Sequence, residues 1–188
     1  MKLSVYAYGH PVLRKKAEVI SNEYPELSKF IEDMWETMYH TRGIGLAAPQ
    51  VGKAIRIFVV DTVQLEDDED ENNSFTGIKK VFINPVKIAE SGEPWSYEEG
   101  CLSIPEVRGK VTRPAQIRIQ YYDENFNLHD EVYDDMNARV IQHEYDHLEG
   151  ILFTDLISPL KKQLIKKRLD KINKGDISMK YKMVFASK

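Results

Sequence analysis

The sequence predicts an α+β fold in which mixed and antiparallel β-sheets pack around a central helix carrying His143-Glu144-Tyr145-Asp146-His147. Three observations support this class. Segments rich in β-branched and aromatic residues recur between residues 55 and 133. An early segment has the 3.6-residue apolar period of an amphipathic helix. Strands and helices do not alternate regularly, as they would in a parallel βαβ sheet.

Residues 25–39 have the clearest helical period in the chain. The apolar positions of this face are Leu27, Phe30, Ile31, Met34, Trp35 and Met38. Pro25 suits the first helical position. Residues 41–52 then break the helix, because Gly43 and Gly45 permit close backbone approaches and Pro49 prevents regular structure. This loop either only connects two elements or lines a substrate site with backbone groups and the Gln50 amide.

The strands are expected at residues 55–61, 80–84, 116–122 and 127–133. Pro85 is expected to end the second of them, and residues 86–88 and 95–98 are expected to form a hairpin across Ser91-Gly92. The acidic run at residues 66–71 repels itself and predicts an exposed loop, either a solvated insertion or a surface for a basic partner.

The helix with the two histidines is expected to begin at a cap on Asp135 or Asn137 and to end before Gly150. A last helix, 159–174, follows a Ser158 cap. Its expected apolar seam is Leu160, Leu164, Leu169 and Ile172, surrounded by lysines. We expect one domain over residues 1–174, which includes this basic helix, and a weakly ordered tail over 175–188.

Composition describes an ordinary globular protein of 188 residues, with 42% hydrophobic and 30% charged residues. The net charge of −4 gives no reason to expect DNA binding, and no apolar run approaches membrane-spanning length. The start resembles no signal peptide, and a lone cysteine cannot form an internal disulfide. We therefore expect a cytoplasmic protein with no membrane contact.

Within a helix, His143 and His147 would lie on one face and could ligate one cation. This is the pattern of metallohydrolases, in which the metal acidifies a bound water and the glutamate, here Glu144, takes its proton. Five residues alone also fit a surface helix with two unrelated histidines.

A catalytic metal needs a third protein ligand. Glu149 and Asp155 lie close along the chain but are not excluded, and Asp170 is the only acid of the last helix. The remaining candidate is Cys101, the only cysteine. A thiolate and two imidazoles would leave one of four tetrahedral positions open for water.

Three motifs in order resemble those of the peptide deformylase family, and the similarity extends from the N-terminus to about residue 160. They are Gly43-Ile44-Gly45-Leu46-Ala47-Ala48-Pro49-Gln50, Glu99-Gly100-Cys101-Leu102-Ser103 and Gln142-His143-Glu144-Tyr145-Asp146-His147. The resemblance implies removal of the formyl group from N-formyl-methionyl termini of nascent polypeptides, with release of formate. It implies Cys101, His143 and His147 as ligands of Fe²⁺, which Zn²⁺, Ni²⁺ or Co²⁺ can replace.

The resemblance also implies that Glu144 is the general base and acid, that the Leu102 N–H and the Gln50 amide stabilise the oxyanion, and that Gly45 belongs to the catalytic loop. A methionine side chain needs an apolar pocket near the metal. The candidates for its lining are Ile44, Met136, Val140 and Arg139, the last with its aliphatic stem inside and its charged head in solvent.

Three other functions compete with this one. A different class of metallopeptidase would need an acidic third ligand in place of Cys101. A structural zinc site would need a fourth ligand. A binding module built on the acidic loop or the basic helix would leave the three motifs unexplained. The basic helix also suggests a contact with the ribosome, although a solvated surface is the simpler interpretation.

Overall fold

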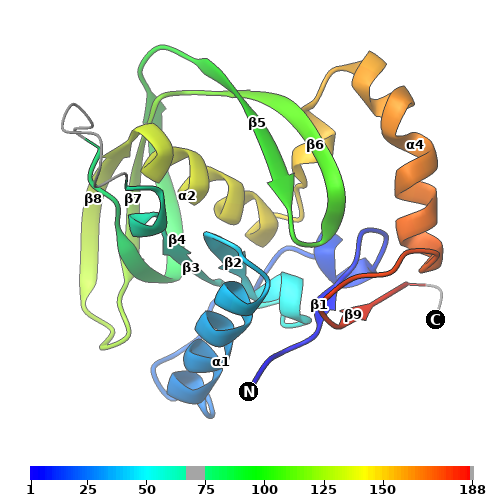
Figure 1. Cartoon of the computed structure of the whole chain (residues 1–188). Helices are drawn as coiled ribbons and strands as arrows, with labels where there is room; N and C mark the ends of the chain where they lie inside the picture. The colour runs from blue at the N-terminus through cyan, green and yellow to red at the C-terminus, as the bar shows by residue number, and fades with distance from the viewer. Residues whose placement is uncertain (67–74, 187–188) are drawn as a thin grey trace.

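A five-stranded sheet and a two-stranded hairpin enclose helix α2, as the computed structural model of residues 1–66 and 75–186 shows (Figure 1). The α-helices of the described residues are α1 (Leu27–His40), α2 (Asp135–Leu148), α3 (Phe153–Leu156) and α4 (Pro159–Lys174). Short 3₁₀ turns are η1 (Pro11–Arg14), η2 (Ala48–Val51) and η3 (Val63–Leu65). No helix among the described residues is both long and apolar enough to cross a membrane.

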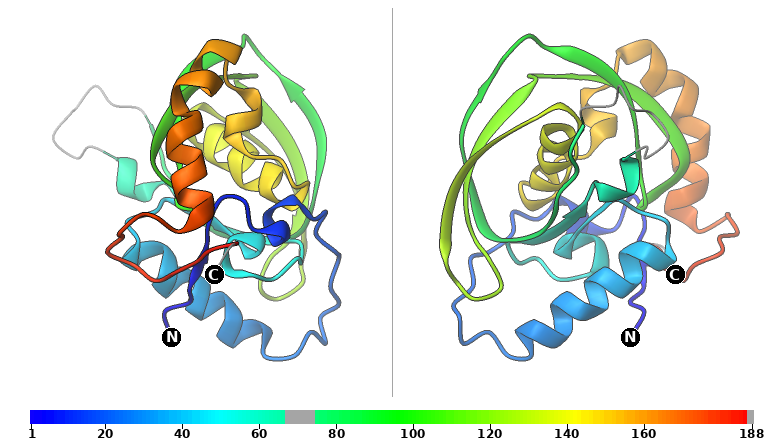
Figure 2. Two further views of the ribbon diagram at one scale, coloured as in Figure 1. Left: turned by 90° about the vertical axis from the view of Figure 1, so that its right-hand side faces the viewer. Right: turned by 60° about the vertical axis from the view of Figure 1, so that its left-hand side comes forward.

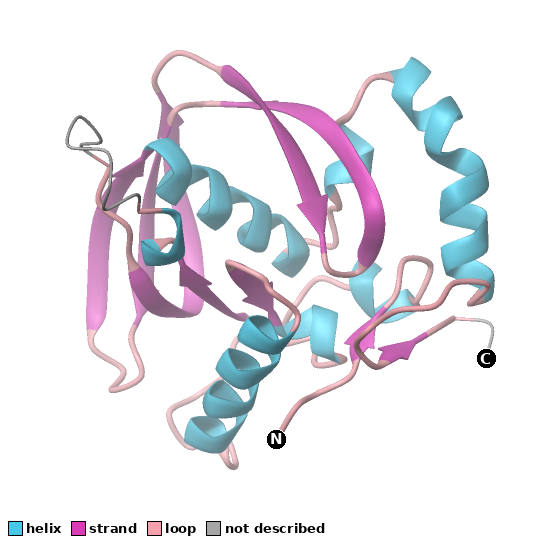
Figure 3. Ribbon diagram, in the orientation of Figure 1, coloured by secondary structure: helices cyan, strands magenta, loops and turns pink. Residues whose placement is uncertain are grey.

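The strands form three separate sheets (Figure 3). They are β1 (Val5–Tyr6), β2 (Gly45–Ala47), β3 (Ile57–Asp61), β4 (Lys79–Ser91), β5 (Trp95–Cys101), β6 (Ile104–Arg113), β7 (Gln116–Tyr122), β8 (Leu128–Asp134) and β9 (Met183–Val184). The large sheet has the order β2-β3-β4-β7-β8 with antiparallel pairs, and β5 pairs with β6. The predicted α+β class with antiparallel sheets is confirmed.

The core of the molecule lies between the large sheet and α2. Phe58 and Phe82 stack on neighbouring strands with ring centroids 4.6 Å apart, and both belong to one buried cluster with Val140 and Ile141 of α2. Side views show the sheet curving around this helix (Figure 2). Burial of the apolar face of α2 leaves its histidine-bearing face directed toward the β5-β6 hairpin.

The predicted hairpin of residues 86–88 with 95–98 is wrong. Strand β4 continues past Pro85 to Ser91 and pairs with β7, whereas β5 pairs with β6. A register shift between Ile83 and Val86 accommodates the proline, which has no N–H to offer a ladder. The strand at 80–84 is therefore the first part of a longer strand.

The N-cap of helix α2 lies one position before Asp135, the first of the two predicted caps, and three before Asn137. It is Asp134, whose side chain makes no capping bond. The Asn137 amide instead donates to the Thr76 carbonyl, and its oxygen accepts from the Thr62 hydroxyl, so this side chain ties α2 to the sheet. Gly150 has φ +72° just after the helix, where a Cβ would come within 2.6 Å of the Arg14 carbonyl oxygen.

The predicted apolar seam of α4 is half wrong. Leu160 and Leu164 are 68% and 72% exposed, while Ile165 and Ile172 are buried. The buried pair is seven positions apart, on the face that packs against Ile104, Val107 and Val111 of β6. Ser158 does cap the helix, since its hydroxyl accepts from the Lys161 N–H.

Where the sequence predicts a weakly ordered tail, the structure has the short strand β9. It pairs in parallel with β1, so the two ends of the chain lie side by side (Figure 1). The most acidic part of the predicted loop, residues 67–74, lies outside the described residues.

Candidate metal centre

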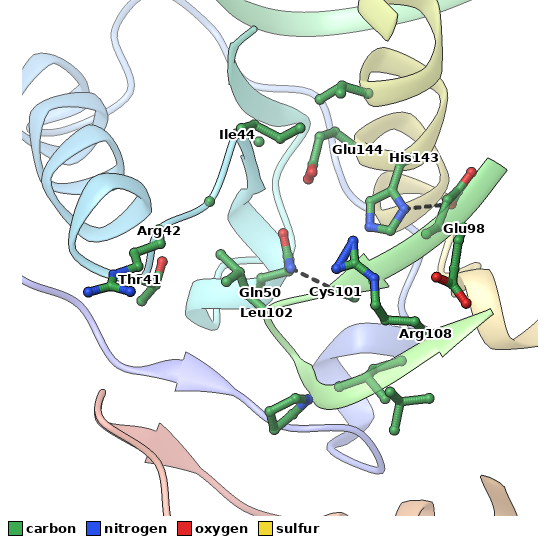
Figure 4. Close-up of a pocket in the computed structure, with 18 of the residues that line it drawn as sticks. Thr41, Arg42, Ile44, Gln50, Glu98, Cys101, Leu102, Arg108, His143 and Glu144 are labelled. Carbon is green, nitrogen blue, oxygen red and sulfur yellow. Dashed lines mark hydrogen bonds and ion pairs between the residues drawn. The ribbon is translucent and has the colours of Figure 1, made fainter. Parts of the chain in front are cut away.

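Three side chains that could ligate a metal ion converge where the end of β5 meets α2. His143 and His147 are one helical turn apart, with ring centroids separated by 5.1 Å, and Cys101 is the last residue of β5. The donor atoms of these three residues all lie within 4.8 Å of one another. The Cys101 Sγ lies 3.4 Å from His147 Nε2. Figure 4 shows Cys101 and His143 in the close-up of the pocket, with His143 on the helix and Cys101 near Gln50.

The hydrogen bonds of the imidazoles leave their ligating nitrogens available. His143 Nδ1 bonds to the Glu99 carboxylate at 2.9 Å, so its Nε2 is the nitrogen left for a metal. His147 is buried, its Nε2 is the nitrogen that lies beside Cys101 Sγ, and its Nδ1 has no partner among the described atoms. One thiolate with two imidazoles suits Zn²⁺ or Fe²⁺. No other His, Cys, Asp or Glu of residues 1–66 and 75–186 joins this group, so the donor set leaves room for a further ligand.

Glu99 is the centre of a buried ion-pair network behind His143. Its carboxylate accepts from Arg113 Nε at 2.7 Å and from Arg139 Nη1 at 3.0 Å, besides the bond from His143. Burial by itself raises the pKa of Glu99, but the hydrogen bonds from His143 and Arg113 lower it well below its usual range. A carboxylate held ionised in this way fixes the orientation of the imidazole.

Glu99 lies in one of the three motifs but no role was predicted for it, and Arg113 was not predicted as a site residue. The signal that could have found both is the two-residue period of a strand. Glu99 lies two positions before Cys101 in β5, and both side chains contact histidines of α2. Arg113 falls on the buried phase of β6, which alternates buried and exposed positions from Val107 onward.

Glu144 has a buried carboxyl group that borders the pocket. It is only 4% exposed, and its Oε2 has no hydrogen-bond partner among the described residues. Burial raises the pKa of this carboxyl group to about 7, so that it can accept and release a proton near neutrality. Gly45 of β2 faces it, and a Cβ at that position would overlap Glu144 Oε1. The absence of a side chain at Gly45 therefore leaves room for the Glu144 carboxylate.

The Gln50 amide is oriented by its own hydrogen bonds. Its Oε1 accepts from the Ala47 N–H at 2.8 Å, which leaves Nε2 directed at Cys101 Sγ, 3.3 Å away (Figure 4). Leu102 follows Cys101 directly and begins a tight turn that leads into β6. The structure thus brings the Gln50 and Leu102 donors beside the three ligating residues.

A pocket of about 550 Å³ opens next to these groups. Of the predicted lining residues, Ile44, Met136 and Val140 all border it. Met136 and Val140 come from α2, which also supplies Glu144, and Ile44 directly precedes Gly45, the first residue of β2. Met179 and Tyr181, near the end of the chain, also border it and were not anticipated from the sequence.

The predicted orientation of Arg139 is wrong. This residue borders the pocket, but it is only 2% exposed and its guanidinium does not reach solvent. The head lies 4.4 Å above the Trp95 ring and donates to the Trp95 and Val111 carbonyl oxygens. Desolvation of this charge is offset by the Glu99 carboxylate, which pulls the head inward toward the hairpin.

Comparisons with known proteins agree on one family. A family model described as polypeptide deformylase matches residues 2–163. A peptide deformylase of Christiangramia forsetii is 54% identical over 98% of this chain and 96% of its own length, and one of Flavobacterium johnsoniae is 52% identical over 100% and 97%. A crystal structure of a peptide deformylase from Legionella pneumophila superposes with a TM-score of 0.80 at 32% identity, covering 94% of this chain and 98% of that one.

Proposed function

This chain belongs to the polypeptide deformylase family, and from that premise we propose how its residues carry out the reaction. Members of the family remove the N-formyl group from nascent peptides in a metal-dependent hydrolysis, and this is the function of the chain. The main support for the residue assignments is that Cys101, His143 and His147 converge beside the buried carboxylate of Glu144, whose Oε2 has no hydrogen-bond partner among the described residues.

Cys101, His143 and His147 hold the metal, and Fe²⁺ is the working ion, with Zn²⁺, Ni²⁺ or Co²⁺ able to replace it. The mixed sulfur and nitrogen donor set supports this choice over Mg²⁺ or Ca²⁺, which prefer oxygen. When bound, such an ion supplies a Lewis acid that polarises a carbonyl group and lowers the pKa of water. Glu99 holds the His143 ring in the orientation that this requires.

Glu144 moves the proton. Its carboxylate takes a proton from the attacking water as the C–O bond to the formyl carbon forms, and it delivers that proton to the nitrogen as the C–N bond breaks. The products are formate and the free amino terminus of methionine. The raised pKa of Glu144 supports both halves of this transfer, because a group that titrates near neutrality can act as base and then as acid.

Gln50 Nε2 and the Leu102 N–H stabilise the negative charge that develops on the formyl oxygen. Because Ala47 already bonds to the Gln50 oxygen, the amide group needs no reorientation during the reaction. Preorganised donors of this kind are each worth about 3 kcal/mol in comparable enzymes.

Ile44, Met136 and Val140 form the apolar lining for the methionine side chain, and Arg139 also borders the pocket while its guanidinium bonds to the Trp95 carbonyl oxygen. The assignment of the ligands is tested by metal analysis of the wild type beside Cys101→Ala, with formate release from formyl-Met-Ala as the measure of activity. We expect the variant to lose both the metal and the activity. Retention of one equivalent of metal by a folded Cys101→Ala protein would remove Cys101 from the ligand set.

We also propose that α4 contacts the ribosome, where formylated chains emerge. Lys166, Lys167 and Lys171 are exposed on this helix, and so are Leu160 and Leu164, which leaves an open face with both basic and apolar side chains. Basic side chains bind RNA phosphates by releasing counterions, so the contact should weaken as salt is added.

A further inference from the structure

The turn after the cysteine is held by contacts from outside its own hairpin. Cys101 and Ile104 pair across β5 and β6, so Leu102 and Ser103 are the central residues of a tight turn. The Leu102 carbonyl oxygen accepts a hydrogen bond from the Tyr181 hydroxyl at 2.8 Å. The Ser103 carbonyl oxygen accepts one from the Tyr8 N–H, also at 2.8 Å. Both central carbonyls of the turn are therefore anchored.

Both anchors belong to the two ends of the chain. Tyr8 follows β1 by two positions and Tyr181 precedes β9 by two positions. The strands pair in parallel with Val5 opposite Met183, and the Ala7 N–H donates to the Val184 carbonyl oxygen at 2.8 Å. Figures 1 and 2 show the two ends of the chain side by side beneath the β5-β6 turn. The pairing of the termini thus sets where both tyrosines meet the turn.

The C-terminal region also contributes to the pocket itself. Met179 and Tyr181 border the cavity that Cys101 and Leu102 border. Arg168 of α4 forms an ion pair with Glu106, a residue of the pocket edge whose backbone has φ +61°. All of these C-terminal residues follow residue 163, where the match to the family model ends.

We propose that Tyr181 is a positioning residue for the deformylation reaction, acting through the Leu102 carbonyl. The bond from its hydroxyl fixes the Leu102–Ser103 peptide and thereby restrains the backbone that aims the Leu102 N–H at the formyl oxygen. A two-residue turn has few other restraints, and a donor that stabilises a transition state is effective only when it is held in place before the reaction. The inference rests on the role proposed above for Leu102 as an oxyanion donor.

The test is Tyr181→Phe, which removes the hydroxyl and keeps the ring that borders the pocket. We expect kcat for formyl-Met-Ala to fall about tenfold, less than the about 100-fold lost when an oxyanion donor itself is removed. KM should stay within about twofold, because the lost restraint acts in the transition state. Tyr24→Phe, which removes a hydroxyl from a residue beside α1, is the matched control and should keep the wild-type kcat.

A second measurement separates the contact from its kinetic consequence. The Leu102 carbonyl carbon and the Ser103 amide nitrogen belong to the peptide group that Tyr181 contacts. Both are observed by NMR in the full chain loaded with diamagnetic Zn²⁺. Their NMR resonances should move in Tyr181→Phe and not in Tyr24→Phe. Unchanged resonances overturn the proposal whatever the kinetics. Moved resonances with an unchanged kcat also overturn it, and they would place the failure in the oxyanion role of Leu102 and not in the contact.

Discussion

The Glu99 carboxylate bonds to His143 Nδ1 at 2.9 Å while two arginines, Arg113 and Arg139, bond to the same carboxylate. The arginines keep the carboxylate ionised inside the protein, and the carboxylate in turn keeps the imidazole turned with its other nitrogen toward Cys101. One buried anion therefore connects the β5-β6 hairpin to α2 and orients His143, which we propose as a metal ligand.

Glu99→Gln should weaken metal binding by about 10- to 100-fold, because a neutral amide holds the imidazole less firmly than a carboxylate. The affinity is measured by competition with a chelator. Glu93→Gln, an exposed glutamate between β4 and β5, is the control. Since the variant also leaves two buried arginines short of a partner, thermal unfolding should be recorded in parallel. Wild-type metal affinity in Glu99→Gln would show that the carboxylate does not orient the ligand.

The Co²⁺-substituted protein should show a thiolate-to-metal charge-transfer band, because Cys101 Sγ lies within 4.8 Å of both ligating histidines. Cys101→Ser should abolish that band by replacing the sulfur with an oxygen. Absorption spectra of the two proteins at equal cobalt content make the comparison. A band that persists in the serine variant would have to arise elsewhere and would exclude Cys101 as a ligand.

Glu144→Gln should keep the metal and lose turnover by about 100- to 10,000-fold, the range expected when a general base is removed. The residue adjoins His143 but belongs to no ligand group, so metal content should not change. Formate release and metal analysis on the same preparation give both values. Glu149→Gln is a control from the end of the same helix, where the carboxylate pairs with Arg56 instead of facing the pocket. Loss of metal from folded Glu144→Gln protein would contradict the assignment.

The elements that the sequence predicted correctly are those with a strong local period. Residues 25–39 and 116–122 carry such a period, and α1 and β7 occupy nearly the same positions. The hairpin of residues 86–88 with 95–98 was predicted wrongly because a proline commonly ends a strand, whereas here a register shift within the same strand, between Ile83 and Val86, accommodates it. Register shifts of this kind depend on the partner strand and leave little trace in the local sequence.

Site residues that lie in one of the three motifs could be predicted from the sequence. Residues brought to the site only by the tertiary fold could not. The spacing of the two histidines and the single cysteine pointed to the three side chains whose donor atoms lie within 4.8 Å of one another. Arg139 could not be oriented, because the attraction of Glu99 and the Trp95 ring for its head depends on the packing of β5 against α2. Tyr181 was missed for the same reason, since it reaches Leu102 from 79 residues away in the chain.

The acid stability of the protein should depend on Glu131 of β8. Burial raises the pKa of this carboxyl group, but the bonds from Lys80, Tyr121 and Tyr133 lower it to about 2. A carboxyl group with a lowered pKa in the folded state stabilises the protein above its unfolded pKa near 4.5, and that contribution disappears as the pH falls toward 2.

Glu131→Gln should therefore lower the free energy of unfolding by about 1 kcal/mol at pH 7, a value reduced for solvent screening of a partly exposed group. The difference from the wild type should shrink as the pH falls from 4.5 toward 2. Urea unfolding at a series of pH values measures it. A difference that stays constant with pH would show that the contribution of Glu131 does not come from its charge.

The final prediction concerns α4, whose exposed face has both lysines and leucines. Reversing Lys166, Lys167 and Lys171 to glutamate should reduce co-sedimentation with ribosomes, because the basic side chains would no longer displace counterions from RNA. Turnover on formyl-Met-Ala should not change, since none of the three borders the pocket. Adding salt should weaken the binding of the wild type and leave that of the variant nearly unaffected. If the wild type fails to co-sediment at low salt, or if the reversed variant co-sediments equally well, α4 has only its structural role of covering β6 with Ile165 and Ile172.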